Sequence, residues 1–125
     1  IKSMISFTHG EGFGRPLLEF SVTGKPIIVS NWSGHLDFIP NTNAVLLPGI
    51  VKKLDPSSVW NNILIKESSW FFVDYKVAET KMKLMYEKPG RFIEMARKQA
   101  NNVNNFTLDK MTIKLKEILE KHKII

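Results

Sequence analysis

Short apolar runs punctuate the first half of the chain, at residues 4–7, 26–29 and 44–47. Such runs, bounded by Gly, Ser or Pro, are typical of buried strands. Because their apolar positions are continuous rather than alternating, they predict a parallel sheet that is covered on both faces. Between the first two runs, Pro16 suits the start and Gly24 the end of a short helix. The pattern therefore predicts one strand–helix–strand unit followed by a third strand.

Residues 48–73 show no clear period. They contain Trp60, Trp70, Phe71 and Phe72, which fit either a hairpin or an irregular loop with an apolar cluster of its own. The sequence leaves both alternatives open.

From Asp74 onward apolar residues recur at intervals of three and four, the period of an amphipathic helix. Pro89 can begin a second helix, and Thr107 is a candidate N-cap for a third. We expect the apolar stripes of all three helices to pack into the core. In chain order the stripe residues are Ala78, Met82 and Met85; Phe92, Ile93, Ala96, Ala100 and Val103; and Leu108, Met111, Leu115, Ile118 and Leu119.

The composition fits one folded domain, with 125 residues, of which 43% are hydrophobic and 24% charged. The chain has no cysteine, which excludes disulfides, thiolate metal ligands and thiol nucleophiles. No apolar run approaches the roughly 20 residues that cross a bilayer, and no His, Asp and Glu residues have the spacing of a metal site. Because the chain does not begin with Met and opens inside an apparent structural element, we expect a piece of a longer protein.

The net charge of +6 raises a second functional hypothesis. Lys and Arg are concentrated in residues 76–123, whereas the first fifty residues hold only Lys2, Arg15 and Lys25. This distribution favours a solvated helical surface over a dedicated polyanion site. A basic α/β module that binds nucleic acid or an anionic membrane surface is therefore the alternative hypothesis. Its membrane form would use the lysines of the third helix, Lys110, Lys114, Lys116 and Lys121.

Residues 8–19 carry the candidate chemistry. The segment THGEGFGRPLLE follows a predicted parallel strand and leads into a helix, and ligands bind at this edge of open α/β sheets. Gly10, Gly12 and Gly14 allow a ligand to approach the backbone, and free N–H groups at a helix start favour a phosphate. A dinucleotide fingerprint is disfavoured, because Leu17 stands where G-x-G-x-x-G needs its last glycine.

Two carboxylates flank this anion site. Glu11 lies in the loop, and Glu19 follows eight residues later on the predicted helix. Carboxylates accept hydrogen bonds from paired hydroxyls, so this arrangement suits a ligand with phosphate between two polyols. A sugar nucleotide has that layout.

These residues resemble the donor-binding domain of retaining GT-B glycosyltransferases. The resemblance rests on EGFGRPLLE, on GKPII with Ser30, Ser33-Gly34 and Asp37, and on NAVLL. It is strong over residues 4–48, thinner over 49–73 and general beyond. It implies an α/β fold: a truncated Rossmann-like three-layer domain with a short parallel sheet, the C-terminal half of a GT-B enzyme, followed by C-terminal helices. Residues 1–125 would form a single partial domain, with a donor-site core at 1–48 and a helical part at 74–122.

The resemblance also implies roles for individual residues. Glu11 matches the glutamate that contacts the donor sugar, and we assign it as the catalytic residue. Glu19 matches the glutamate that accepts hydrogen bonds from the ribose hydroxyls. The backbone around these two matches the segment that meets the sugar and diphosphate, namely Gly12, Phe13, Gly14, Arg15 and Leu17. No metal ion and no cofactor are expected beyond the nucleotide-diphosphate sugar itself.

The expected activity is retaining transfer to a saccharide or lipid-linked acceptor, in the cytoplasm or peripherally at the inner face of the membrane. The expected partner is a missing N-terminal domain of the same protein, without which the isolated chain should be inactive; nucleic acid is not expected. The strand at residues 4–7 would then have a bare edge, which predicts a homo-oligomer through that edge.

Overall fold

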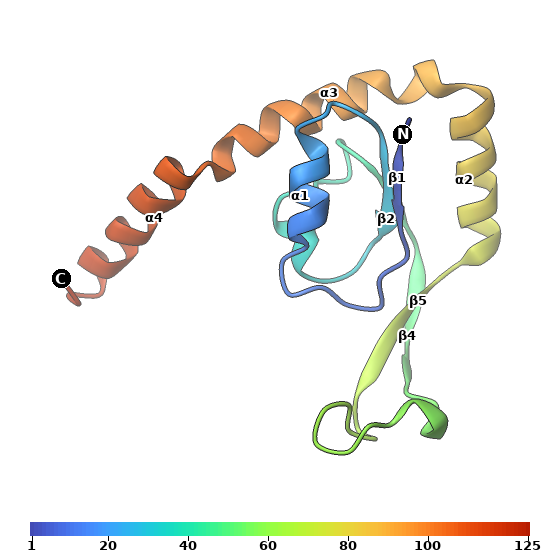
Figure 1. Ribbon diagram of the computed structural model, residues 1–125, viewed down its shortest axis with the longest axis horizontal. Coiled ribbons are helices and arrows are strands. Elements are labelled where there is room, and N and C mark those ends of the chain that lie inside the picture. Colours follow the sequence, from blue (N-terminus) through green and yellow to red (C-terminus); the bar gives the residue numbers. More distant parts are fainter.

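The computed structural model describes residues 1–125 as a mixed α/β domain with a short parallel sheet. Strands β1 (Met4–Ser6), β2 (Ile27–Ser30) and β3 (Val45–Leu47) lie in the order β1-β2-β3 (Figure 1). Both pairings are parallel, with Met4 beside Ile27 and Ile28 beside Val45. Helix α1 (Arg15–Ser21) connects β1 to β2. The predicted strand–helix–strand unit and third strand are confirmed.

The central strand β2 is buried on both faces, because all four of its residues are buried. Ile28 packs into a cluster with residues of the later elements, including Phe71, Ala78 and Met85. Its neighbours Ile27 and Val29 belong to a second cluster with Leu17 of α1. Helix α1 therefore covers one face, while the second half of the chain covers the other (Figure 1). This arrangement explains why the apolar run is continuous.

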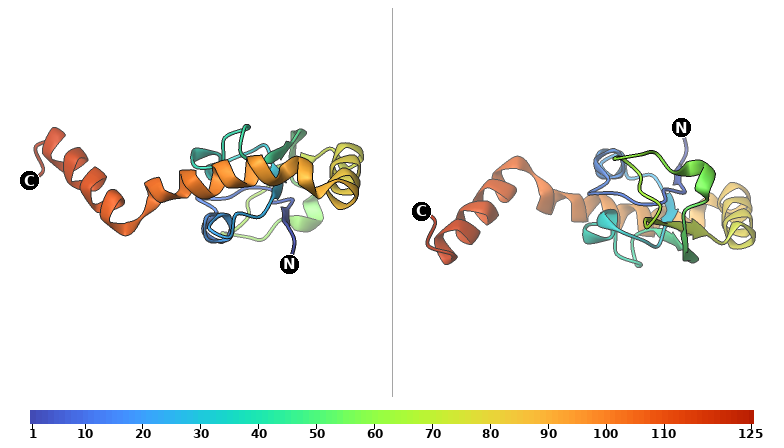
Figure 2. Two further views of the ribbon diagram at one scale, coloured as in Figure 1. Left: turned by 90° about the horizontal axis from the view of Figure 1, so that it is seen from above. Right: turned by 90° about the horizontal axis from the view of Figure 1, so that it is seen from below.

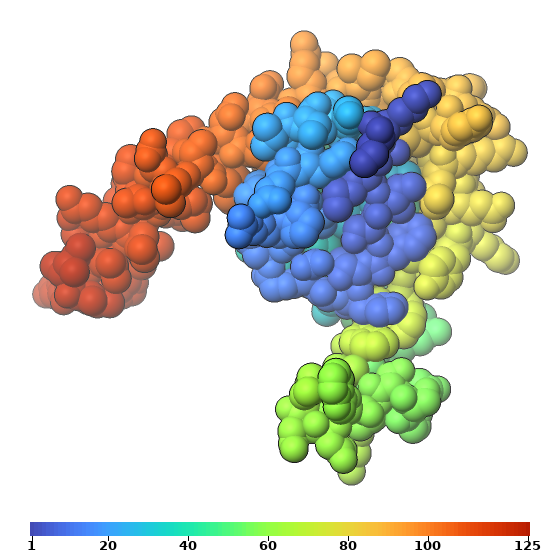
Figure 3. All heavy atoms as spheres, viewed as in Figure 1, coloured from blue at the N-terminus to red at the C-terminus, as the bar shows by residue number.

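Residues 49–73 form an antiparallel hairpin of β4 (Gly49–Lys53) and β5 (Ser69–Val73). The hairpin settles the alternative that the sequence leaves open. Its far end, which includes a short 3₁₀ helix η2 (Pro56–Ser58), stands clear of the body in Figure 3. Asp55 caps η2, and the hydroxyl and N–H of Ser57 that donate to its carboxylate lower the pKa of Asp55.

The helical part begins as expected. Asp74 is the N-cap of α2 (Tyr75–Glu87), and its carboxylate accepts from the N–H groups of Lys76 and Val77. Pro89 starts the 3₁₀ helix η3 (Pro89–Phe92), which leads directly into α3 (Ile93–Asn102). After η4 (Val103–Phe106), the hydroxyl of Thr107 caps α4 (Leu108–Lys121). None of these helices is both long enough and apolar enough to cross a membrane.

Two stripe residues are more exposed than predicted. Met82 is 39% exposed and Ile93 is 62% exposed. Both line a hollow of about 690 Å³ between the free edge of β1 and the helices α2 and η3. No strand lies beyond β1 to cover them, so the prediction of core positions is wrong for these two residues.

The stripe of α4 is a larger correction. No residue of this helix is buried, and Figures 1 and 2 show it extending away from the body. The prediction that its stripe packs into the core is therefore wrong. The amphipathic pattern is present, but within this chain nothing covers it.

Candidate functional site

The candidate site lies where the carboxyl ends of the parallel strands meet. The loop after β1 turns at this edge before it enters α1 (Figure 1). Strand β2 ends at the same edge, because β1 and β2 are parallel, and a second segment begins there. It leads into the 3₁₀ helix η1 (Gly34–Asp37). Two chain segments thus converge on the edge at which α/β sheets bind ligands.

Two hydrogen bonds join these two segments. The N–H of Glu11 donates to the hydroxyl of Ser33 at 2.7 Å, and the N–H of Gly34 donates to the carbonyl of Glu11 at 3.0 Å. A Cβ on Gly34 would collide with the carbonyl oxygen of Gly12. The backbone at Glu11 is therefore held from both sides before any ligand is present.

Gly14 makes the turn from the loop into α1. Its φ of 88° lies in the left-handed region, and a Cβ there would lie 2.9 Å from the Cβ of His35. Pro16 occupies the first turn of the helix, and Leu17 anchors it with only 2% of its surface exposed. Residue 14 therefore needs glycine both for its conformation and for the space beside His35.

Free N–H groups follow one another through this turn. Those of Gly12, Phe13, Gly14 and Arg15 donate no hydrogen bond within the chain. The N–H of Leu17 donates to the carbonyl of Gly14 at 2.9 Å, so the unpaired donors precede it. Consecutive unpaired N–H groups at a turn form an anion-binding surface.

The two glutamates differ in their surroundings. Glu11 is half-buried, and its carboxylate has no hydrogen-bond or ion-pair partner in the chain. Glu19 is exposed, and its Oε1 lies 2.7 Å from Nε of Arg15. Exposed pairs of this kind contribute only about 0–1 kcal/mol. Breaking the Arg15–Glu19 pair therefore costs little free energy.

The hairpin supports the loop from the other side. Phe71 of β5 donates its N–H to the carbonyl of His9 at 3.2 Å, and its own carbonyl lies 2.7 Å from Nδ1 of His9. The imidazole also stacks on Trp70, with ring centroids 4.6 Å apart. His9 thus links the loop to the hairpin, a role that its position in the sequence does not reveal. Phe13, farther along the loop, packs on Phe38 at 4.9 Å.

A buried histidine lies below the turn. Nε2 of His35 is 2.7 Å from the carbonyl oxygen of Ser30, and His35 has no exposed surface. Nδ1 of His35 and the hydroxyl of Ser30 are both buried without a partner. Sequence reasoning did not single out Ser33 or His35 as site residues. The Ser-Gly pair after the second strand was the available signal for Ser33.

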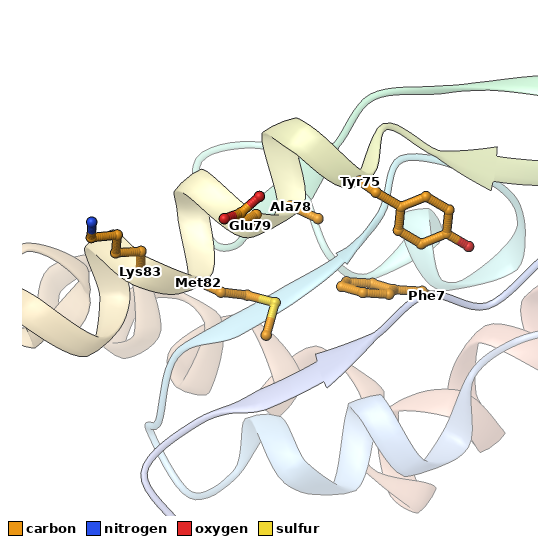
Figure 4. Close-up of a pocket in the computed structure, with 6 residues that line it drawn as sticks. All are labelled: Phe7, Tyr75, Ala78, Glu79, Met82 and Lys83. Carbon is orange, nitrogen blue, oxygen red and sulfur yellow. The ribbon is translucent and has the colours of Figure 1, made fainter.

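Three hollows of the surface lie away from this loop, along β1 and α2. Figure 4 shows one of about 450 Å³, in which Phe7, Tyr75 and Met82 face one another. No group of three or more His, Asp or Glu residues is arranged to hold a metal ion. The candidate site consists of the unpaired N–H groups of residues 12–15, with Glu11 before them and Glu19 after them in the chain.

No family model, curated protein or solved structure matches this chain.

Proposed function

We propose that the chain binds the nucleotide-sugar donor of a retaining glycosyltransferase. The observation that carries this proposal is the row of unpaired N–H groups from Gly12 to Arg15, with Glu11 before it and Glu19 after it. Phosphate oxygens are strong acceptors for such donors, and hydrogen bonds to a charged group are about twice as strong as neutral ones. The sheet, with α1 on one face and α2 on the other, would correspond to part of a Rossmann-like GT-B donor domain.

Each part of the donor has a proposed place. The diphosphate lies on the unpaired N–H groups. Glu19 exchanges its pair with Arg15 for the ribose hydroxyls, which stabilises the bound nucleoside. Glu11 accepts from hydroxyls of the transferred sugar, and its fixed backbone holds the carboxylate near the position where positive charge develops.

The reaction proposed for the whole enzyme is transfer of the sugar to a saccharide or lipid-linked acceptor in the cytoplasm. The contribution of this chain is positioning and electrostatic stabilisation of the departing diphosphate. The site as described uses only backbone N–H groups and carboxylates, so the proposal assigns no role to a metal ion or a further cofactor.

The test is an NMR titration of the chain, resolved by amide, with UDP, GDP and ADP. One nucleotide should shift the amides of Gly12, Phe13 and Gly14. Glu19→Gln should weaken this binding by roughly ten-fold, the loss of about one charge-assisted hydrogen bond. Glu79→Gln, which removes an exposed carboxylate from α2, is the matched control and should leave it unchanged. Shifts confined to other regions of the chain would refute the proposal.

A further inference from the structure

A half-exposed tryptophan lies beside the candidate site, at the carboxyl edge of the sheet. Trp32 follows the end of β2 and is 42% exposed. Its indole stacks on the ring of Phe71 in β5, with the two planes 2° apart and the centroids 5.6 Å apart. Phe71 is itself buried, so it holds the indole in a fixed orientation. No other aromatic ring stacks on Trp32.

The contacts of the two loops place Trp32 relative to the proposed donor. Ser33, the next residue, accepts a hydrogen bond from the N–H of Glu11 at 2.7 Å. Phe71, on which Trp32 lies, donates its N–H to the carbonyl of His9, which precedes Glu11 in the first loop. Trp32 therefore lies on the side of Glu11 that is away from the unpaired N–H groups. In the proposed function this is the sugar end of the donor.

The residue between the indole and this carboxylate has a strained backbone. Ser33 has a φ of 75° and a ψ of −159°, a combination that glycine adopts almost exclusively. Such strain persists where the surrounding contacts determine the conformation, and it is concentrated at ligand-binding sites. The hydroxyl of Ser33 is one of these contacts. An aromatic face and the unpaired carboxylate of Glu11 are thus presented next to each other.

We propose that Trp32 binds a sugar ring by stacking, while Glu11 accepts hydrogen bonds from the hydroxyls of that ring. A pyranose has an apolar face of C–H groups, which fits the electron-rich face of an indole, and its hydroxyls need polar acceptors. The position does not suit a nucleobase, because the proposed function places the nucleoside at Glu19, beyond the other end of the N–H row. The ring belongs either to the transferred sugar of the donor or to an acceptor saccharide. The identity of the ligand rests on the proposed function.

The experiment follows the indole N–H signals of the three tryptophans in NMR spectra of the full chain. The probes are UDP, GDP and ADP, the nucleotide sugars UDP-glucose, GDP-mannose and ADP-glucose, and the methyl glycosides of glucose and mannose. The signal of Trp32, assigned from its loss in Trp32→Phe, should shift with a sugar-containing probe and not with the bare nucleotides. A shift with a nucleotide sugar identifies the donor sugar. A shift with a methyl glycoside but with no nucleotide sugar identifies an acceptor saccharide.

Three variants separate binding from a structural role. Trp32→Ala should weaken binding of the sugar-containing probe by about ten-fold and leave binding of the bare nucleotide unchanged. Trp32→Phe keeps an aromatic face and should retain most of the affinity. Trp60→Ala removes a tryptophan that is 67% exposed between β4 and β5 and is the matched control, which should change neither. If Trp32→Ala weakened binding of both probes equally, Trp32 would only support the loop and the proposal would be overturned.

The other outcomes distinguish this inference from the proposed function. If bare nucleotides shift the amides of Gly12, Phe13 and Gly14 but no sugar shifts Trp32, the inference fails and the proposed function stands. If a methyl glycoside shifts Trp32 and no nucleotide binds, the proposed function fails and the saccharide site stands. A shift of Trp32 by bare nucleotides would overturn the inference, because a base would then stack there. If no probe shifts any of these signals, both are refuted.

Discussion

Gly34 and Gly12 approach each other so closely that a Cβ on Gly34 would lie 2.0 Å from the Gly12 carbonyl oxygen. The two glycines belong to different loops, one after β2 and one after β1. Their contact, together with the hydrogen bond from Gly34 N–H to the carbonyl of Glu11, presents the row of unpaired N–H groups in a fixed position. The proposed donor site therefore depends on a residue that would not itself touch the donor.

Replacing Gly34 tests this relationship. Gly34→Ala should force the two loops apart and lower the free energy of unfolding by about 1–3 kcal/mol, the usual cost of overpacking. It should also abolish nucleotide binding. Urea denaturation measures the first effect and the NMR titration measures the second.

The matched control is Gly10→Ala in the same loop, because a Cβ at Gly10 meets nothing within 4 Å. This variant should keep both stability and binding. If the Gly34→Ala and Gly10→Ala variants had the same free energy of unfolding, the close contact of Gly34 with Gly12 would not be needed to hold the two loops together.

Gln99 provides a second test, of the core rather than the site. Its side chain is buried, donates to Ser21 and to the Phe38 carbonyl, and accepts from Asn43. Gln99→Ala leaves the side-chain N–H of Asn43 without its buried partner, at about 1–3 kcal/mol, and removes one of two hydrogen bonds at both the Phe38 carbonyl and the Ser21 hydroxyl. We expect a loss of at least about 2 kcal/mol in unfolding free energy.

Asn101→Ala, at an exposed position of the same helix, is the control for Gln99. It should change stability by less than about 0.5 kcal/mol. If the two variants unfolded at the same urea concentration, the buried network would contribute nothing to stability.

The free edge of β1 predicts self-association. β1 pairs with β2 on one side only, and its Ile5 is 41% exposed beside the hollow at α2. Unpaired edges of this kind pair with other strands. We therefore predict a homo-oligomer through β1 at tens of micromolar, measured by sedimentation velocity.

Ile5→Lys should convert this oligomer to a monomer, because a charge on an edge strand opposes pairing. Val22→Lys places the same charge on an exposed residue at the end of α1 and should leave the oligomer intact. A strictly monomeric wild-type profile would contradict this prediction.

The parts of the fold that follow local rules could be predicted from the sequence. Apolar runs located the strands, and Pro16, Asp74 and Thr107 marked helix starts because proline geometry and side-chain caps act within a few residues. The helical period of α4 could also be recognised in the sequence. The partner that covers its apolar stripe could not be predicted, because an amphipathic pattern specifies which face is apolar and not what packs on that face.

The candidate site could be predicted only in part. The loop and its two glutamates were visible, because glycine spacing and carboxylates are features of the local sequence. The contribution of Phe71 to the loop was not, since its partner His9 is 62 positions away. Gln99 likewise reads as a surface residue of a helix, and only the tertiary structure supplies its buried partners.

The most direct test of the proposed function is a thermodynamic cycle on Glu19. Binding of the preferred nucleoside diphosphate and of its 2′,3′-dideoxy form is measured by calorimetry, for the wild type and for Glu19→Gln. If Glu19 accepts from the ribose hydroxyls, removing them should weaken wild-type binding by about ten-fold and binding by the variant much less. If the two chains lose the same affinity, or if neither binds a diphosphate, Glu19 does not bind ribose and the donor-site account is contradicted.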